Sequence, residues 1–112
     1  MVGVGNPEPG QQLLPLRFTM DQNFPNPFNP TTVIRYALPA QSRVSLRIYD
    51  VLGQEVCTLV DEVQSAGYRT VSWNSRTDRG VQAASGVYFA RLIVEETHGS
   101  VFSEVRKMLL VK

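Results

Sequence analysis

Two side chains in this sequence could act as a nucleophile or a general base, Cys57 and His98. His98 is the single histidine, and it stands beside Gly99 between two β-patterned runs, where a hairpin turn would hold it in solvent. Cys57 lies inside an alternating run with no basic neighbour, so we expect a small strand residue with an ordinary thiol. A triad needs a base beside its nucleophile, and none can be assembled. The sequence therefore predicts no catalytic residues and no enzyme activity.

Carboxylates are the other groups that could do chemistry, as acid and base or as metal ligands. Asp78 lies in the turn-rich stretch 74–80 and could offer an oxygen to calcium, which takes about six to eight oxygen ligands. An aspartate ahead of a turn glycine more commonly bonds its own backbone, and no cysteine and histidine spacing suits another metal. We therefore expect no metal and no cofactor, with a calcium ion at Asp78 as the alternative.

Composition narrows the classes of partner. The 112 residues carry a formal net charge of +1 and are 43% hydrophobic and 19% charged, which is typical of one globular domain. Lysine and arginine are scattered singly, so nucleic acid is a poor candidate partner. No stretch is long and apolar enough for a membrane helix, and membrane insertion is not expected.

Residues 1–17 differ in composition from the rest of the chain. They hold the glycines and prolines of a semi-extended linker, which are Gly3, Gly5, Pro7, Pro9, Gly10 and Pro15. The segment lacks the basic start and apolar block of a signal peptide. We expect the linker 1–17 to join a domain at 18–112 to a preceding part of a longer polypeptide, of which the domain is the C-terminal module.

From residue 31 onward the apolar residues alternate along the chain, which indicates β-strands. The clearest predicted core residues are Ile34, Tyr36, Leu38, Val44, Leu46 and Ile48. The runs 86–96 and 100–112 should form a hairpin, and Gly80 should close the loop 74–80 with a positive φ. About seven short strands without helical spacing, around Trp73 as core centrepiece, predict an all-β, immunoglobulin-like antiparallel β-sandwich.

A proline-rich stretch stands directly before the first β-patterned run. Its members, which we call the collar, are Pro25, Asn26, Pro27, Phe28, Asn29 and Pro30. Each proline fixes its own φ and biases the residue before it toward extended geometry, while the two asparagines can cap turns. We expect a preformed lead-in to the first strand, with the ring of Phe28 folded back onto the sandwich edge.

The order and spacing of four motifs resemble the C-terminal sorting domain of the type IX secretion system. The motifs are QNFPNPFNP (22–30), IYDVLGQ (48–54), SGVY (85–88) and KMLLVK (107–112). The resemblance extends over residues 18–112. The same strand core is also similar to the immunoglobulin-like domain of flagellar hook-capping proteins.

The resemblance implies a non-catalytic module that takes an attached N-terminal cargo to the cell surface or the medium, after transit through the periplasm. An outer-membrane translocon reads the domain, and a sortase-like peptidase commonly removes it afterwards. On this chain, cleavage would fall in the linker between Gly3 and Leu16. The recognition residues would be Gly86, Val87, Tyr88, Lys107, Met108, Leu109, Leu110, Val111 and Lys112.

Two positions depart from the family pattern, and other functions stay open. Ser75 stands where many relatives carry glycine, and Ala90 stands where a second aromatic is frequent. An accessory carbohydrate-binding module would use exposed aromatic rings, for which Tyr49 and Tyr68 are the candidates. A structural spacer is the other alternative. A long terminal hairpin could also be exchanged between two copies, giving a swapped dimer.

Overall fold

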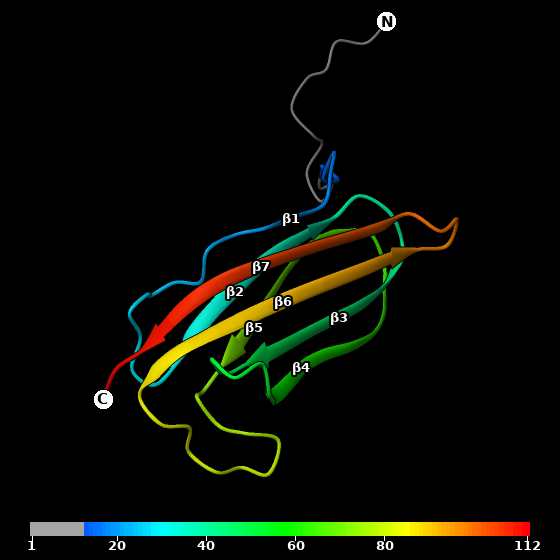
Figure 1. The fold of residues 1–112 in the computed structure, drawn as a ribbon. Coiled ribbons are helices and arrows are strands. Elements are labelled where there is room, and N and C mark those ends of the chain that lie inside the picture. Colours follow the sequence, from blue (N-terminus) through cyan, green and yellow to red (C-terminus); the bar gives the residue numbers. More distant parts are fainter. Residues whose placement is uncertain (1–12) are drawn as a thin grey trace, which may run out of the picture.

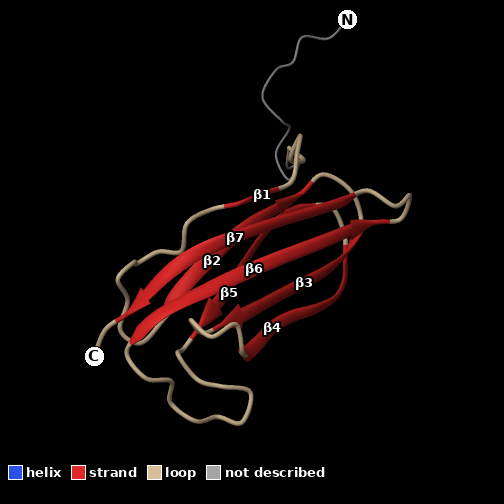
Figure 2. Ribbon diagram, viewed as in Figure 1, coloured by secondary structure: helices blue, strands red, loops and turns tan. Residues whose placement is uncertain are grey.

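The computed structural model describes residues 13–112, which form two antiparallel sheets packed face to face (Figures 1 and 2). The strands are β1 (Thr19–Met20), β2 (Thr32–Leu38), β3 (Ser42–Tyr49), β4 (Glu55–Gln64), β5 (Gly67–Trp73), β6 (Gly86–Glu96) and β7 (Val101–Leu110). One sheet has the order β1-β2-β5 and the other the order β4-β3-β6-β7. The predicted seven-stranded, immunoglobulin-like β-sandwich is confirmed.

The core consists of the alternate residues that face the space between the sheets. All six core residues predicted from the pattern of the early strands are at most 3% exposed. The second sheet contributes the same kind of residue from β6, where Ala90, Leu92 and Val94 are fully buried. Burial of this continuous apolar layer is what stabilises the sandwich.

The turns and connections follow from residue types as expected. β6 and β7 form the predicted hairpin, with Gly86 opposite Leu110 and Glu95 opposite Val101. Gly80 has a φ of 79°, as predicted for the loop 74–80. In the described part of the chain, no helix is long and apolar enough to cross a membrane.

Three short pairings made by residues before β2 were not predicted. β1 pairs with β2, so that Thr19 lies opposite Ala37. Further along, Phe24 forms an isolated antiparallel bridge with Val33, and Phe28 forms a parallel bridge with Leu110. The segment between β1 and the collar therefore runs from the edge of one sheet to the edge of the other.

Candidate functional site

Neither Cys57 nor His98 lies in a reactive setting. His98 is exposed in the turn between β6 and β7, as predicted. Cys57 is buried in β4, where burial and the nearby carboxylate of Asp78 raise the pKa of its thiol to about 11. Cys57 is a strand residue, as expected, but its thiol is not ordinary: the raised pKa keeps it protonated at neutral pH.

Asp78 caps a strand edge. Its Oδ1 accepts the backbone N–H of Thr58 at 3.1 Å, and its own N–H donates to the carbonyl of Val56 at 3.2 Å. The expected bond to its own backbone is therefore replaced by bonds to β4, far away in sequence. Across residues 13–112, no group of three or more histidine, cysteine, aspartate and glutamate residues is placed to hold a metal ion.

The two tyrosines considered for carbohydrate binding lie on different sheets. Tyr49 ends β3 and points out from the four-stranded sheet, because its neighbour Ile48 is buried in the core. Tyr68 is exposed on β5, in the three-stranded sheet. The two rings therefore do not form a single binding strip.

Three of the four motifs that carry the family resemblance meet in one place. The SGVY motif begins β6, and its Gly86, Val87 and Tyr88 lie opposite residues of β7. The partners in that pairing are Leu110, Leu109 and Met108. Gly86 has a φ of 150°, which L side chains rarely adopt, so the backbone itself requires glycine there.

Three aromatic rings join the collar to this pairing. The ring of Phe28 folds back as expected, is 1% exposed, and lies 5.8 Å from the ring of Trp73. The ring of Tyr88 packs edge-on against Trp73, with 5.3 Å between the ring centroids. The Tyr88 hydroxyl donates to the carbonyl of Ala84 at 2.6 Å, and burial raises the pKa of that hydroxyl. The ring of Phe28 thus anchors the otherwise exposed collar to the core.

The collar also bonds to the outer edge of β7. The N–H of Phe28 donates to the carbonyl of Leu109 at 2.9 Å, and the carbonyl of Phe28 accepts the N–H of Val111 at 3.0 Å. Asn26 Oδ1 accepts the N–H of Leu109 at 2.9 Å. Asn26 was expected to cap a turn, but its partner lies 83 residues away. These bonds satisfy edge groups that would otherwise invite another strand.

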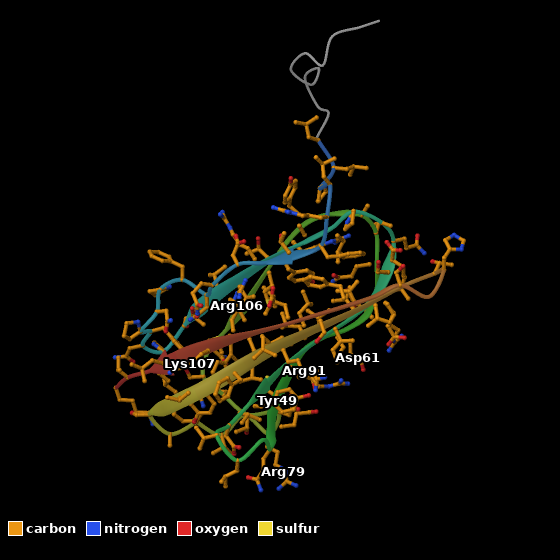
Figure 3. The ribbon with its side chains drawn as sticks, turned by 45° about the horizontal axis from the view of Figure 1, so that its top comes forward. Tyr49, Asp61, Arg79, Arg91, Arg106 and Lys107 are labelled. Carbon is orange, nitrogen blue, oxygen red and sulfur yellow. The ribbon has the colours of Figure 1, made fainter. Side chains whose placement is uncertain are left out.

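Two further side chains extend this attachment along β7. Gln22 Nε2 donates to the carbonyl of Lys107 at 2.7 Å. Arg106 Nε donates to the carbonyl of Met20 at 3.0 Å. Figure 3 places Arg106 and Lys107 next to each other on the half of β7 that leads to the chain end. The sealed part of the edge therefore begins at Lys107 and continues to Val111.

A buried polar cluster fixes the start of the collar. Asn23 Nδ2 donates to Thr32 Oγ1 at 2.9 Å and to the carbonyl of Pro25 at 3.2 Å. Thr32 Oγ1 donates to the same carbonyl at 2.8 Å. Asn23 and Thr32 are almost completely buried, so each bond replaces one that water would otherwise supply.

Ser75 fixes the other end of the collar. Its hydroxyl donates to the carbonyl of Pro30, and its own carbonyl accepts the N–H of Ala83 at 2.7 Å. Ser75 is fully buried with a φ of 65°, in the left-handed region that favours glycine. Glycine would adopt this φ without strain. In this chain, the hydrogen bond from the Ser75 hydroxyl to the collar offsets the strain of the serine backbone. Ala90, the other departure, is a fully buried core residue of β6.

Exposure divides the predicted recognition residues of the last strand into two sets. Met108 and Leu110 are buried in the core. The exposed residues are Lys107, Leu109, Val111 and Lys112. The first set holds the fold, and the second set is available to a partner.

The linker prediction falls mostly outside the described residues. Residues 1–12 are not described, so the predicted cleavage region from Gly3 to Leu16 can be followed only from Leu13 onward. Leu16 is 98% exposed, whereas Phe18 stacks on Phe102 at 5.6 Å. The described chain is therefore accessible up to residue 17, with Pro15 as a buried exception, and its first packed residues are Phe18 and Met20.

Sequence reasoning missed the polar residues that attach the collar, namely Gln22, Asn23, Thr32 and Arg106. Gln22 and Asn23 lie outside the alternating runs. Thr32 and Arg106 do lie on the inward faces of β2 and β7, but a polar residue there does not match the apolar pattern that identifies core residues. The sequence did contain one signal for the attachment at Ser75. Glycine is frequent at this position in the family pattern, and glycine commonly marks a positive φ.

The sandwich is similar to solved structures of longer proteins. It matches the dimeric latent PorU of Porphyromonas gingivalis with a TM-score of 0.68 and 22% identity, over 85% of this chain and 9% of that one. It matches PorZ, an essential surface component of the type IX secretion system of the same bacterium, with a TM-score of 0.52 and 23% identity, over 85% of this chain and 11% of that one. This chain thus spans a small part of either protein.

The hook-capping relationship appears in the same comparison. The structure of FlgD from P. aeruginosa matches with a TM-score of 0.56 and 22% identity, over 70% of this chain and 60% of that one. At such identities these likenesses show the fold alone. A search of curated protein sequences gave no match. The model of the FlgD Ig-like domain matches residues 29–98, which is more than half of the chain, and the chain therefore belongs to the FlgD Ig-like domain family.

Proposed function

We propose that this domain is a sorting domain, which directs an attached protein across the outer membrane through the type IX secretion system. The observation that carries the proposal is the joining of the collar, the SGVY motif and the last strand into one unit by aromatic packing and backbone bonds. Three of the four motifs that resemble the sorting family are thus parts that bond to one another. Likeness to PorZ, a surface component of that system, supports the same context.

In this proposal the translocon reads the exposed side chains of the last strand while the domain stays folded. Lys107 and Lys112 supply positive charge, and Leu109 and Val111 supply apolar surface between them. No step requires a catalytic group in the domain. The cargo is covalently attached ahead of the linker, and the delivered protein becomes secreted or displayed at the cell surface.

Removal of the domain would take place in the linker. A sortase-like peptidase needs an accessible, extended segment, and the exposed residues Leu13, Leu14 and Leu16 belong to the stretch in which we place cleavage. The packed collar would stop cleavage from reaching the sandwich. Limited proteolysis of the folded domain should therefore cut first before Phe24; a first cut between Leu38 and Val105 would contradict this part of the proposal.

Export of a fluorescent cargo fused ahead of residues 1–112, in a host with the type IX system, tests the proposal. Simple truncation after Arg106 is unsuitable, because it removes the buried Met108 and Leu110 and unfolds the domain. The test variant instead replaces only the exposed side chains, as Lys107→Ser, Leu109→Ser, Val111→Ser and Lys112→Ser. Its matched control carries Val63→Ser and Tyr68→Ser, two exposed residues far from β7.

We expect the test variant to accumulate in the periplasm and the control to reach the surface or the medium. Both must show the circular dichroism and thermal unfolding of a folded sandwich. Equal export of the two variants would contradict recognition through the last strand. Such a result would favour a structural spacer, the alternative that the likeness to FlgD supports.

A further inference from the structure

We propose that the open part of the β7 edge binds an extended strand of a partner protein, which adds a fifth strand to the four-stranded sheet. This part comprises Val101, Ser103 and Val105 and ends at Lys107. The inference goes beyond the proposed sorting role and stands without it, because it concerns the open backbone groups of residues 101–105; the two proposals share only the side chain of Lys107.

The direction of the backbone groups follows from Leu109. Its N–H and its carbonyl both point away from β6, because they bond to Asn26 and Phe28. In an antiparallel strand every second residue points its backbone groups to the same side. Val101, Ser103 and Val105 therefore also present their N–H and C=O groups to the outer edge of β7.

These groups lack partners in the described part of the chain. The carbonyl of Lys107 bonds to Gln22, and from there to Val111 the edge is sealed. No hydrogen bond within residues 13–112 reaches the outward groups of Val101, Ser103 or Val105. β7 is the last strand in its sheet, and Figure 1 shows it at the border of that sheet. An extended segment placed there would gain a regular ladder of backbone bonds.

The flanking side chains define the chemistry of the partner strand. Val101 is 65% exposed and Val105 46% exposed on the outer face, which suits apolar residues at alternate positions of the added strand. Lys107 continues the same row and forms no ion pair among the described residues, which suits an acidic residue opposite it. On the inner face, Phe102 stacks on Phe18 and provides a packed floor.

A second copy of this chain fits the edge less well. Two copies paired antiparallel about Ser103 would place Val101 opposite Val105, but Lys107 would lie opposite Gly99. The turn residues beside Gly99 carry no carboxylate within the stretch 98–100, so the lysine would stay without a counter-charge. The observed edge therefore favours a different chain with an acidic residue at that position.

The test uses the isotope-labelled domain and a capped probe peptide of sequence Glu-Thr-Val-Thr-Thr-Thr-Val. Paired antiparallel, its glutamate meets Lys107 and its valines meet Val105 and Val101. In an NMR titration we expect the amide signals of those residues and of Ser103 to shift together. No shift, or shifts centred on another part of the sandwich, would overturn the proposal.

A proline substitution tests the backbone ladder itself. Ser103→Pro removes an outward N–H and leaves the β6 to β7 bonds intact, because edge positions tolerate proline. We expect about tenfold weaker binding or worse, as for losing about 1.4 kcal/mol. Thr70→Pro is the matched control: Thr70 lies opposite Arg35, whose carbonyl bonds to Asp21, so the Thr70 N–H also points outward, at the edge of the other sheet. Unchanged binding by Ser103→Pro would contradict the proposal.

Exchanging the charges of Lys107 and the probe glutamate tests the same pairing without a proline variant. Lys107→Glu should weaken binding of the probe, and a probe with lysine in place of its glutamate should restore it. Failure of this rescue would overturn the predicted pairing. Sedimentation of the free domain tests whether a second copy binds this edge. A dimer that Ser103→Pro dissociates would overturn the proposal and assign the edge to a second copy.

Discussion

The two halves of β7 differ in what covers their outer edge. From Lys107 to Val111 the edge bonds to Gln22, Asn26 and Phe28, residues that precede it by most of the chain length. From Val101 to Val105 the backbone groups of the same strand have no such cover within residues 13–112. Protection of this edge therefore comes from the collar and from Gln22 ahead of it, rather than from the composition of β7 itself.

Removing the ring of Phe28 should break the sealed half and have the largest effect. The side chain is buried against Trp73, so Phe28→Ala leaves a cavity and should lower the free energy of unfolding by about 3–5 kcal/mol. Phe24→Ala is the control, because that ring is 79% exposed and its loss should change stability by about 0.5 kcal/mol or less. Urea denaturation of both variants measures this, and equal losses would show that the collar does not hold by packing.

Changes at Ser75 should loosen the far end of the collar by a smaller amount. Ser75→Ala removes the bond to Pro30 and keeps a side chain at a φ of 65°, so we expect a loss of about 1–2 kcal/mol. Ser75→Gly loses the same bond but relieves the backbone, and should be about 1 kcal/mol more stable than the alanine variant. Thermal unfolding of the two variants measures this difference. A glycine variant less stable than the alanine variant would show that the positive φ at residue 75 does not strain the backbone.

The β4 edge offers a third comparison, which depends on pH. There the loop containing Asp78 covers the strand beside Cys57, whose pKa rises from an ordinary 9.0 to about 11. Between these pH values the unfolded chain loses its thiol proton first, so stability should fall as pH rises. The wild type should lose more stability than Cys57→Ala between about pH 8 and about pH 10.5. Parallel urea midpoints would contradict the buried state of the thiol.

The sequence predicted the layers of this molecule better than its attachments. Alternation identified the inward residues of β2 and β3, because a core face imposes its period on the strand. The bonds from Asn26 to Leu109 and from Asn23 to Thr32 could not be predicted. They join polar residues of irregular stretches to partners that only the folded chain brings near. Proline content suggested a rigid collar, but it did not indicate which strand edge the collar covers.

Amide hydrogen exchange along β7, resolved by residue, tests whether the collar covers the outer edge of the last strand. We predict that the N–H groups of Leu109 and Val111 exchange slowly, because Asn26 and Phe28 hold them, and that those of Val101, Ser103 and Val105 exchange rapidly. In Phe28→Ala the slow set should become fast. Uniform protection along β7, or protection of Val111 that survives this substitution, would show that the collar does not protect the edge of β7.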